Sequence, residues 1–416
     1  MSNNANIFNS DAAYVNGPIN VVRLEGSVAG IPKVIYLFLE IHQNLREQTE
    51  SKNIYSRDVH KYLADIFYKL NNTETKYDFF MEIVPTDIDP SQNTDGNNIY
   101  ILKLRKFFSE MFEYDSKNNL VKPSETFRNV RFHYLDIRDY LSFNIYFLLH
   151  QALLISRSMR NSSDFSSTSL QKIMNILANV VVTIDQLIEI FKSSKNPNDK
   201  KPLIDPKNQE KVNRTIDPNI IHKLFHKLRE SYKHPEIRDK LVFSLKLSLL
   251  ELGKLLKEID QCIKLLITYM SLYEKTKNKL CLCKTTGSYV YGLDTMTTES
   301  MLFEIDKSIY RIFISSVSIF AKITDVYFLR RFLDKDYITN AIVYTGYGHS
   351  LNYINLLVSQ FGFKVTHCSY NFMNDMEKLN KQIKKFMQPD PDISRYFLPP
   401  VLQQASDMSK FPDSFK

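Results

Sequence analysis

The sequence predicts an α/β protein with a mainly parallel sheet flanked by helices and a large all-helical insertion. Two observations predict this fold. Near both ends of the chain, short continuous apolar runs such as VIYLFLE alternate with amphipathic helical segments, which is typical of parallel strands covered on both faces. Between about residues 141 and 280, apolar residues instead repeat with the 3.6-residue period of long helices.

The first part of the α/β core, residues 20–145, has the pattern strand, helix, strand, helix, strand. The strands are the runs VIYLFLE, YDFFMEIV and VRFHYLDIRDY, and the helices are SRDVHKYLADIFYKL and the segment near residues 99–114. The stretch from Pro85 to Asn98 is rich in Pro, Asp and Asn, so we expect a long, mobile loop there.

The helical insertion is predicted to span residues 146–285, with a charged surface loop near residues 192–218. The second part of the core, residues 286–388, has two helices through MLFEIDKSIYRIFISSV and ITDVYFLRRFL. The strand NAIVYTGYGH, the helix SLNYINLLVSQFG and the strand FKVTHCSY follow. We expect residues 1–19 to be a flexible N-terminus and residues 389–416 to be a tail that extends over the surface.

Composition narrows the classes of function. With 44% hydrophobic and 24% charged residues, the 416-residue chain can bury a sizeable core. The net charge is +8, but the basic residues are scattered, which gives little support for nucleic acid as a partner. The four cysteines are too few for a disulfide framework, and the apolar runs are broken by charges, so we expect a cytoplasmic protein without a membrane span.

Polar side chains follow several of the predicted strands. In sheets of this kind, ligands bind at the carboxyl ends of the strands. A single polar residue at such a place is usually paired or solvated, but four strand ends with acidic, imidazole or guanidinium groups favour a shared site. These residues are Glu40 and His42, Glu82, Asp136 and Arg138, and His349.

Two kinds of chemistry suit this set. His42 and His349, with the carboxylates, can bind a divalent metal that activates water. Alternatively, an imidazole held by a carboxylate can act as a general base while an arginine stabilises negative charge. Gly346 and Gly348, which precede His349, would let the backbone approach a ligand closely, although a tight turn explains them equally well.

The segments FLEIH, DFFMEI, YLDIRDY, DVYFLRRF and IVYTGYGHSLNYINLL resemble the erythromycin esterase/ChaN-like superfamily, which includes the TraB and Tiki proteins. The resemblance covers roughly residues 20–145 and 300–370 and is greatest for uncharacterised members from large amoeba-infecting DNA viruses. It implies a pocket with catalytic residues Glu40, His42, Glu82 and His349. The residues that would bind substrate are Asp136, Arg138, Asp325 and Gly346, of which all but Gly346 match the viral members alone.

One departure from this pattern concerns Leu39, which stands where the superfamily has glycine. A bulky side chain there would narrow the pocket and weaken or abolish activity. The sequence therefore leaves two hypotheses. The first is a hydrolase, either an esterase or a metal-dependent peptidase-like enzyme, with an unknown small-molecule or peptide substrate. The second is an inactive viral structural or host-interaction protein, in the host cytoplasm or the virion, whose helical part binds a partner protein.

Overall fold

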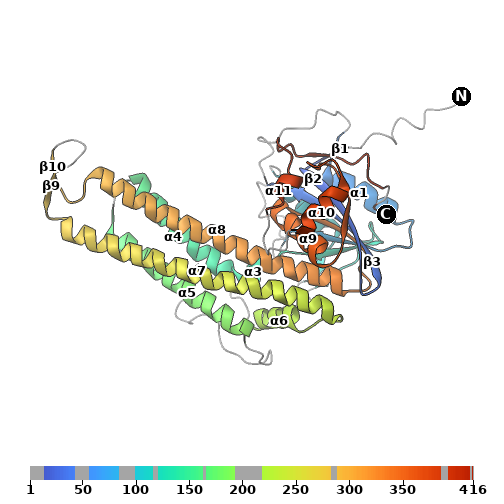
Figure 1. The fold of residues 1–416 in the computed structure, drawn as a ribbon, viewed down its shortest axis with the longest axis horizontal. Helices are drawn as coiled ribbons and strands as arrows, with labels where there is room; N and C mark the ends of the chain where they lie inside the picture. The colour runs from blue at the N-terminus through green and yellow to red at the C-terminus, as the bar shows by residue number, and fades with distance from the viewer. Residues whose placement is uncertain are drawn as a thin grey trace. The chain divides into compact units, whose positions relative to one another are not determined.

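The computed structural model describes residues 14–42, 56–83, 99–115, 120–162, 165–192, 218–282, 288–385, 392–412 and 415. They form two compact units (Figure 1). The sheet unit comprises Met1–Ile137, Tyr232–Leu241 and Thr324–Lys416, and the helical unit comprises Arg138–Ser231 and Val242–Ile323. The expected mobile loop at residues 85–98 lies outside the described residues, as do residues 1–13 and nearly all of the predicted surface loop, residues 193–217.

The sheet unit is built on a six-stranded sheet of order β12-β2-β3-β11-β5-β8. Its strands are β2 (Asn20–Val28), β3 (Ile31–Glu40), β5 (Tyr77–Met81), β8 (Val130–Tyr134), β11 (Asn340–Gly346) and β12 (Lys364–Cys368). The strands β3, β11, β5 and β8 run parallel, as their apolar runs predicted. The other two pairings, β2 with β3 and β12 with β2, are antiparallel, so the sheet is mixed rather than mainly parallel.

The strand β2 is absent from the sequence prediction. It is joined to β3 by a two-residue turn, Ala29-Gly30, in which both residues have positive φ angles, 52° and 79°. Such turns match the twist of antiparallel strands and close a tight hairpin. Ala-Gly is a weak turn signal compared with Asn-Gly, which explains why the hairpin was missed.

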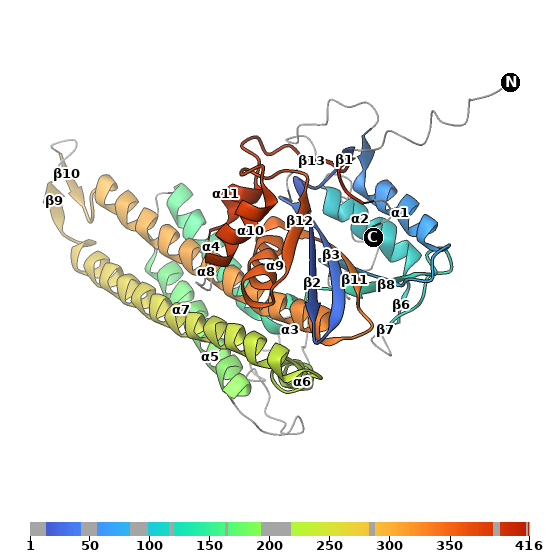
Figure 2. The ribbon, with the colours of Figure 1, turned by 45° about the vertical axis from the view of Figure 1, so that its right-hand side comes forward.

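Helices cover both faces of this sheet (Figure 2). The helices α1 (Val59–Leu70) and α2 (Tyr100–Met111) pack on the face that carries Phe38 and Phe79. The opposite face carries Phe80, whose ring lies 5.0 Å from that of Phe328 in α8 (Thr295–Asp334). Phe328 in turn lies 4.5 Å from Tyr353 in α9 (Tyr347–Gln360). The sheet is thus buried on both sides, as its continuous apolar strands require.

Both ends of the described chain pack into the sheet unit. The strand β1 (Tyr14–Asn16) pairs with β13 (Ala405–Asp407) and with β4 (Arg57–Asp58). Two further helices, α10 (Met376–Lys385) and α11 (Ser394–Phe397), precede β13. Phe415 is buried, with its ring 4.6 Å from that of Tyr36. The predictions of flexible residues 14–19 and of an extended tail were therefore wrong, because the apolar partners of these segments lie far away in the sequence.

The helical unit confirms the 3.6-residue period. It contains α3 (Arg138–Leu141), α4 (Phe143–Ser162), α5 (Ser167–Lys192), α6 (Pro218–Arg229) and most of α7 (Pro235–Thr276) and α8. The hairpin of β9 (Leu280–Leu282) and β10 (Tyr289–Tyr291) joins α7 to α8, and a second small hairpin, β6 (Tyr114–Asp115) with β7 (Leu120–Val121), belongs to the sheet unit.

The two helices expected within residues 301–333 are one continuous helix, α8, of which the part before Thr324 belongs to the helical unit. The two predicted helices would be divided just after Ser315 and Ser316. In the helix, however, the Ser316 hydroxyl donates a hydrogen bond to the carbonyl oxygen of Phe313, so that the polar side chain is satisfied without ending the helix.

Among the described residues, α5 and α8 are long and apolar enough to cross a membrane by length and composition. Core helices of soluble proteins meet the same criteria, and 56% of the most apolar part of α8 is buried inside the protein. The expectation that the chain has no membrane span therefore stays a prediction.

The buried tail gives a test of the fold. Phe415→Ala should lower the free energy of unfolding by about 3 kcal/mol, because it removes a ring from the core formed with Tyr36 and Phe38. Val401→Ala is the matched control, since Val401 lies in the same tail and is 69% exposed; it should change stability by less than about 0.5 kcal/mol. Urea denaturation measures both, and equal effects would show that the tail does not contribute to the core.

Candidate functional site

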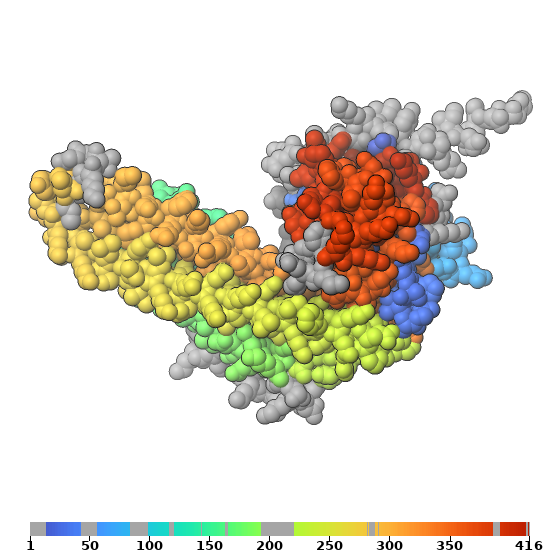
Figure 3. Space-filling view, viewed as in Figure 1, coloured from blue at the N-terminus to red at the C-terminus, as the bar shows by residue number. Residues whose placement is uncertain are grey.

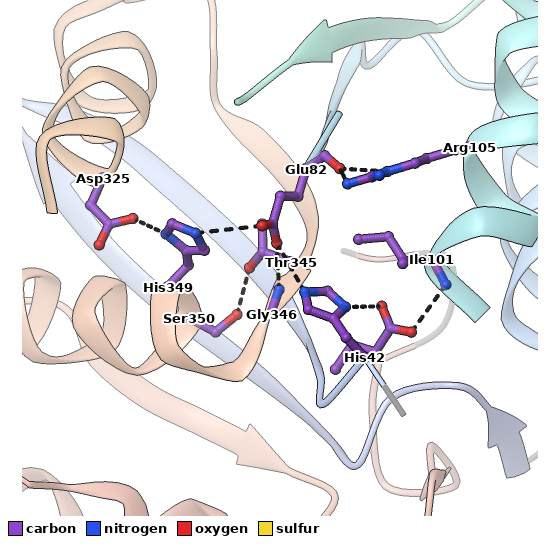
Figure 4. Close-up of polar contacts among 10 residues, drawn as sticks. His42, Glu82, Ile101, Arg105, Asp325, Thr345, Gly346, His349 and Ser350 are labelled. Carbon is purple, nitrogen blue, oxygen red and sulfur yellow. Dashed lines mark hydrogen bonds and ion pairs between the residues drawn. The ribbon is translucent and has the colours of Figure 1, made fainter. Parts of the chain in front are cut away.

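Five ionisable side chains of alternating charge form a row at the carboxyl edge of the parallel strands (Figure 4). All five belong to the sheet unit. Four of them have side chains no more than 8% exposed, whereas that of His42 is 40% exposed. The order along the row is Glu40, His42, Glu82, His349 and Asp325.

Glu40, the last residue of β3, is fully buried at the first end of the row. Its Oε1 accepts a hydrogen bond of 3.0 Å from the backbone N–H of Ile101 in the first turn of α2. That N–H has no partner within the helix, so the carboxylate satisfies it. Its Oε2 lies 3.2 Å from Nδ1 of His42. Burial raises the pKa of Glu40, and the nearby imidazole opposes this shift.

His42 is held between two carboxylates. Its Nδ1 faces Glu40, and its Nε2 lies 3.5 Å from Oε2 of Glu82. Its φ angle is 52°, a left-handed conformation that is uncommon outside glycine but is more frequent for histidine than for most residues. Burial opposes the charged ring, but Glu40 and Glu82 outweigh it and raise the pKa of His42 to about 9.

Glu82, which directly follows β5, is the central member of the row. Its Oε2 accepts a hydrogen bond of 2.8 Å from the backbone N–H of Gly346, and its Oε1 lies 3.6 Å from Nε2 of His349. Its backbone carbonyl accepts hydrogen bonds from the guanidinium of Arg105 in α2. Both the side chain and the backbone of Glu82 are therefore fixed.

Gly346 ends β11 and precedes α9. A Cβ atom at this position would lie only 2.9 Å from Nε2 of His42 and 3.5 Å from Oε2 of Glu82. Its φ angle of −53° is open to any residue, so space rather than backbone conformation requires glycine here. The sequence predicted that the backbone here approaches a ligand closely, and that stays a prediction; the group that the structure places against Gly346 is the His42 ring.

His349, in the first turn of α9, forms the far end of the row together with Asp325. Its Nδ1 lies 2.5 Å from Oδ1 of Asp325, whose Oδ2 accepts a hydrogen bond from the Asn352 side chain. Burial disfavours the charged imidazole, but Asp325 and Glu82 outweigh it and raise the pKa of His349 to about 10. The two carboxylates therefore favour the protonated form of this buried ring.

The structure brings together six of the eight residues singled out in the sequence: Glu40, His42, Glu82, Asp325, Gly346 and His349. Asp136 lies beside the row along the backbone, because its N–H donates a hydrogen bond to the carbonyl oxygen of Ile83, one residue after Glu82. Arg138 begins α3 and belongs to the helical unit. Their predicted role in substrate binding stays a prediction.

Sequence reasoning missed the contributions of Ile101, Arg105 and Asn352. The first two come from α2, whose start carries no capping side chain that would have pointed to Glu40 or Glu82. Asn352 lies three residues after His349, which places it on the same face of α9, and this spacing was the one available signal.

Leu39 does not fill the space beside Glu40. Its side chain is fully buried, and the alternation of a strand places it on the opposite face of β3 from Glu40. Leu39, which stands where the erythromycin esterase/ChaN-like superfamily has glycine, is thus a core residue. The expectation that Leu39 narrows the pocket has no support on the Glu40 side of the sheet.

The row does not suit a metal ion. Glu82 lies between the two imidazoles, and both nitrogens of His349 face carboxylates. Within the described part of the chain, no group of three or more His, Cys, Asp or Glu side chains is arranged to hold a metal. The structure therefore adds no support to the hypothesis that His42 and His349 are metal ligands, which stays a prediction.

Comparison with known proteins gives a family. Residues 13–416 match the model of a family of unknown function, DUF5847. The chain belongs to the DUF5847 family. It is 36% identical to the uncharacterised protein R706 of Acanthamoeba polyphaga mimivirus, with both chains covered in full, and 33% identical to protein R161 of the same virus over 97% of this chain and 98% of that protein.

These relatives confirm the expected likeness to proteins of amoeba-infecting giant viruses. No solved structure matches the chain. These comparisons do not link this DUF5847 protein to the erythromycin esterase/ChaN-like superfamily or to an enzymatic activity. Both ideas therefore depend on the geometry of the row alone.

The glycine at the centre of the row gives a test with a matched control. Gly346→Ala should push the His42 ring away from Glu82 and lower the pKa of His42 from about 9 toward its ordinary value of 6.5. Gly348→Ala should leave that pKa unchanged, because a Cβ there meets open space. NMR titration of the His42 ring protons measures both, and an unchanged pKa in the Gly346 variant would refute the steric argument.

The raised pKa of His349 can be tested through the pH dependence of stability. Because the pKa of His349 is raised on folding from 6.5 to about 10, its stabilising effect is complete below pH 6.5 and is lost as the pH rises to about 10. Asp325→Asn removes the main source of this shift, so the variant should lose less stability than the wild type between pH 6.5 and 10. Urea denaturation across this range measures the slope, and Asp65→Asn, an exposed carboxylate, is the control that should keep it.

Proposed function

We propose that this protein is a hydrolase in which the row at the sheet edge activates a water molecule. The observation that carries the proposal is the position of His42, a partly exposed imidazole fixed by carboxylates on both sides in a row that is otherwise buried. An imidazole oriented by a carboxylate is the usual arrangement for general acid–base chemistry. The resemblance of these same residues to the erythromycin esterase/ChaN-like superfamily supports the proposal.

Each member of the row has a distinct role in this proposal. Glu40 holds Nδ1 of His42, and Nε2, 3.5 Å from Oε2 of Glu82, is the nitrogen that exchanges a proton with a water bound between His42 and Glu82. Glu82 orients that water together with His42. The His349–Asp325 pair places a second imidazole against Oε1 of Glu82 and so holds that carboxylate in position.

The substrate belongs to a class that water can cleave, such as an ester or a peptide-like amide. The helical unit is, in this proposal, an insertion into the α/β core, since the chain leaves the sheet unit after Ile137 and returns to it for good at Thr324. By analogy with the mimivirus relatives, we propose that the protein acts in the host cytoplasm or within the virion.

The rival hypothesis, an inactive protein that works by binding partners, is favoured by one observation. The helical unit exposes many large apolar side chains, among them Phe243, Leu250, Tyr291, Met296 and Phe303. Such exposure marks interaction surfaces more often than catalytic ones.

The proposal is tested by a screen of chromogenic esters and peptide amides. His42→Ala should lower any turnover at least about 100-fold, the contribution of a general base. Leu39→Gly is the control: it should destabilise the core without raising the rate, because Leu39 lies on the other face of the sheet. Turnover that persists in His42→Ala would exclude the assigned base, and no turnover with any substrate would favour the rival hypothesis.

The pH dependence of the rate shows whether His42 accepts or donates a proton. A base must be neutral to accept a proton, and the raised pKa keeps His42 protonated below about pH 9. The rate should therefore rise with pH until about 9 rather than level off near 6.5. A rate that falls over this range would show that His42 donates a proton instead.

A further inference from the structure

The hydroxyl group of Tyr344 is buried beside the Glu40 end of the row. The Tyr344 side chain is fully buried, and among the described residues its hydroxyl has no hydrogen-bond partner of good geometry. The same holds within the described chain for Oε2 of Glu40, which has Nδ1 of His42 3.2 Å away as an ion-pair contact. Buried polar atoms in native proteins are nearly always hydrogen-bonded, so two such neighbours are natural partners for each other.

The strand register brings the two side chains together. Across the parallel strands β3 and β11, Glu40 pairs with Gly346 and Phe38 pairs with Tyr344. The Phe38 and Tyr344 rings stack with their centres 6.4 Å apart, so they lie on the same face of the sheet, and the alternation of β3 places Glu40 on that face too. Because Gly346 has no side chain, the β11 side chain nearest to Glu40 is that of Tyr344, at the diagonal spacing that an aromatic residue can span.

Other segments of the sheet unit close around the hydroxyl group. A Cβ atom at Gly17 would lie 3.2 Å from the hydroxyl oxygen, and the φ angle of Gly17 is 129°, which favours glycine at this close approach. The first turn of α2 borders both partners, since Tyr100 acts on Tyr344 and the N–H of Ile101 binds Oε1 of Glu40. The hydroxyl is thus enclosed on the side of the sheet where Glu40 lies.

Glu40 is the acid that acts most strongly on this hydroxyl, through its charge and through hydrogen bonding, and Asp58 acts on it less. Together with burial, these carboxylates raise the pKa of Tyr344 well above its usual value, so the hydroxyl keeps its proton and can donate a hydrogen bond. Contacts of this kind are often long until a site is occupied. The chemistry of the pair therefore makes Tyr344 the donor and Glu40 the acceptor.

The carboxylate of Glu40 needs a further donor. Burial raises its pKa and so favours the neutral form, and the charge of Glu82 acts in the same direction, whereas His42 and the N–H of Ile101 oppose the shift. A carboxylate oxygen has two lone pairs, so Oε2 can accept one hydrogen bond from Nδ1–H of His42 and a second from a hydroxyl. A second donor at Oε2 would favour the ionised form that the imidazole requires.

We propose that the Tyr344 hydroxyl donates a hydrogen bond to Oε2 of Glu40 and so positions this carboxylate against Nδ1 of His42. Because Tyr344 is fully buried, it acts on the reaction through Glu40 and not on the substrate. With Oε1 held by Ile101 and Oε2 by Tyr344, the carboxylate fixes the proton of His42 on Nδ1 and leaves Nε2 as the base. The consequence for catalysis rests on the proposed hydrolase function, whereas the hydrogen bond itself does not.

Urea denaturation of Tyr344→Phe tests the hydrogen bond. The variant keeps the ring that packs against Phe38 and loses only the hydroxyl. If the hydroxyl donates to Glu40, the variant should be less stable than the wild type; if it is unpaired, the variant should be equally or more stable, because a buried unpaired hydroxyl is costly. The loss should be smaller in a Glu40→Gln background, since a neutral amide is a weaker acceptor than a carboxylate. A Tyr344→Phe variant at least as stable as the wild type would overturn the proposal.

Tyr134→Phe is the matched control. The Tyr134 hydroxyl is also buried with no hydrogen-bond partner in the described part of the chain, and its pKa is raised by burial and by Tyr114 rather than by a carboxylate. This variant should therefore keep the stability of the wild type. A loss equal to that of Tyr344→Phe would show that removal of any buried hydroxyl destabilises this protein, and the contact with Glu40 would have no support.

The titration of Glu40 separates positioning from packing. Loss of a donor to the ionised form raises the pKa of a carboxyl group, so the midpoint for Glu40 should move up by about one pH unit in Tyr344→Phe. NMR of protein with ¹³C at the glutamate carboxyl carbons measures this, with the Glu40 signal assigned from Glu40→Gln. Tyr134→Phe should leave the midpoint in place. An unchanged midpoint in Tyr344→Phe would refute the positioning role, whatever its stability.

The effect on rate links this residue to the proposed function. With an ester or amide that the wild type cleaves, Tyr344→Phe should lower kcat about tenfold and leave KM unchanged, because a buried hydroxyl does not bind substrate. An unchanged kcat would exclude a role in the reaction. If the wild type cleaves nothing, the proposed function fails, and the stability and titration results still decide whether Tyr344 holds Glu40.

Discussion

The carboxylate of Glu82 is the contact on which the rest of the site depends. It accepts the N–H of Gly346 and lies between the imidazoles of His42 and His349. Its own backbone carbonyl is held by Arg105. Through this residue the ends of β5 and β11 and the starts of α2 and α9 are fixed at one place, although they come from opposite ends of the chain.

The alternation of charge explains how so many ionisable groups can be buried together. A single buried carboxylate is costly, and a buried pair repays this cost only with good geometry and further hydrogen bonds. In the row, each of the three carboxylates faces an imidazole. Backbone or side-chain amide N–H groups also donate hydrogen bonds to Glu40, Glu82 and Asp325. The exposed edge of His42 is where this fixed row meets solvent, which is why the proposed proton transfer is assigned to it.

The helix α8 has a different role in each part of the protein. Its last turns, in the sheet unit, supply Asp325 to the row and Phe328 to the core of the sheet. Its earlier turns, in the helical unit, carry buried apolar side chains on one side and exposed apolar side chains, such as Phe303 and Tyr310, on the other. The surface of α8, in orange, is open along the helical unit in Figure 3. Because of this double use, apolar residues occur on more than one face of α8.

The sequence by itself determined the four parallel strands, the helical middle and the polar residues at the strand ends, because each is a local pattern of period or of apolar run followed by charge. Only the tertiary structure decided that β2 and the C-terminal tail join the sheet unit, and that His349 pairs with Asp325 and Glu40 with the N–H of Ile101. Those contacts join residues far apart along the chain, such as Phe415 and Tyr36, and leave no periodic trace in either segment. The requirement for glycine at position 346 is of the same kind: its reason is the His42 ring, which only folding brings within 3 Å of where a Cβ would lie.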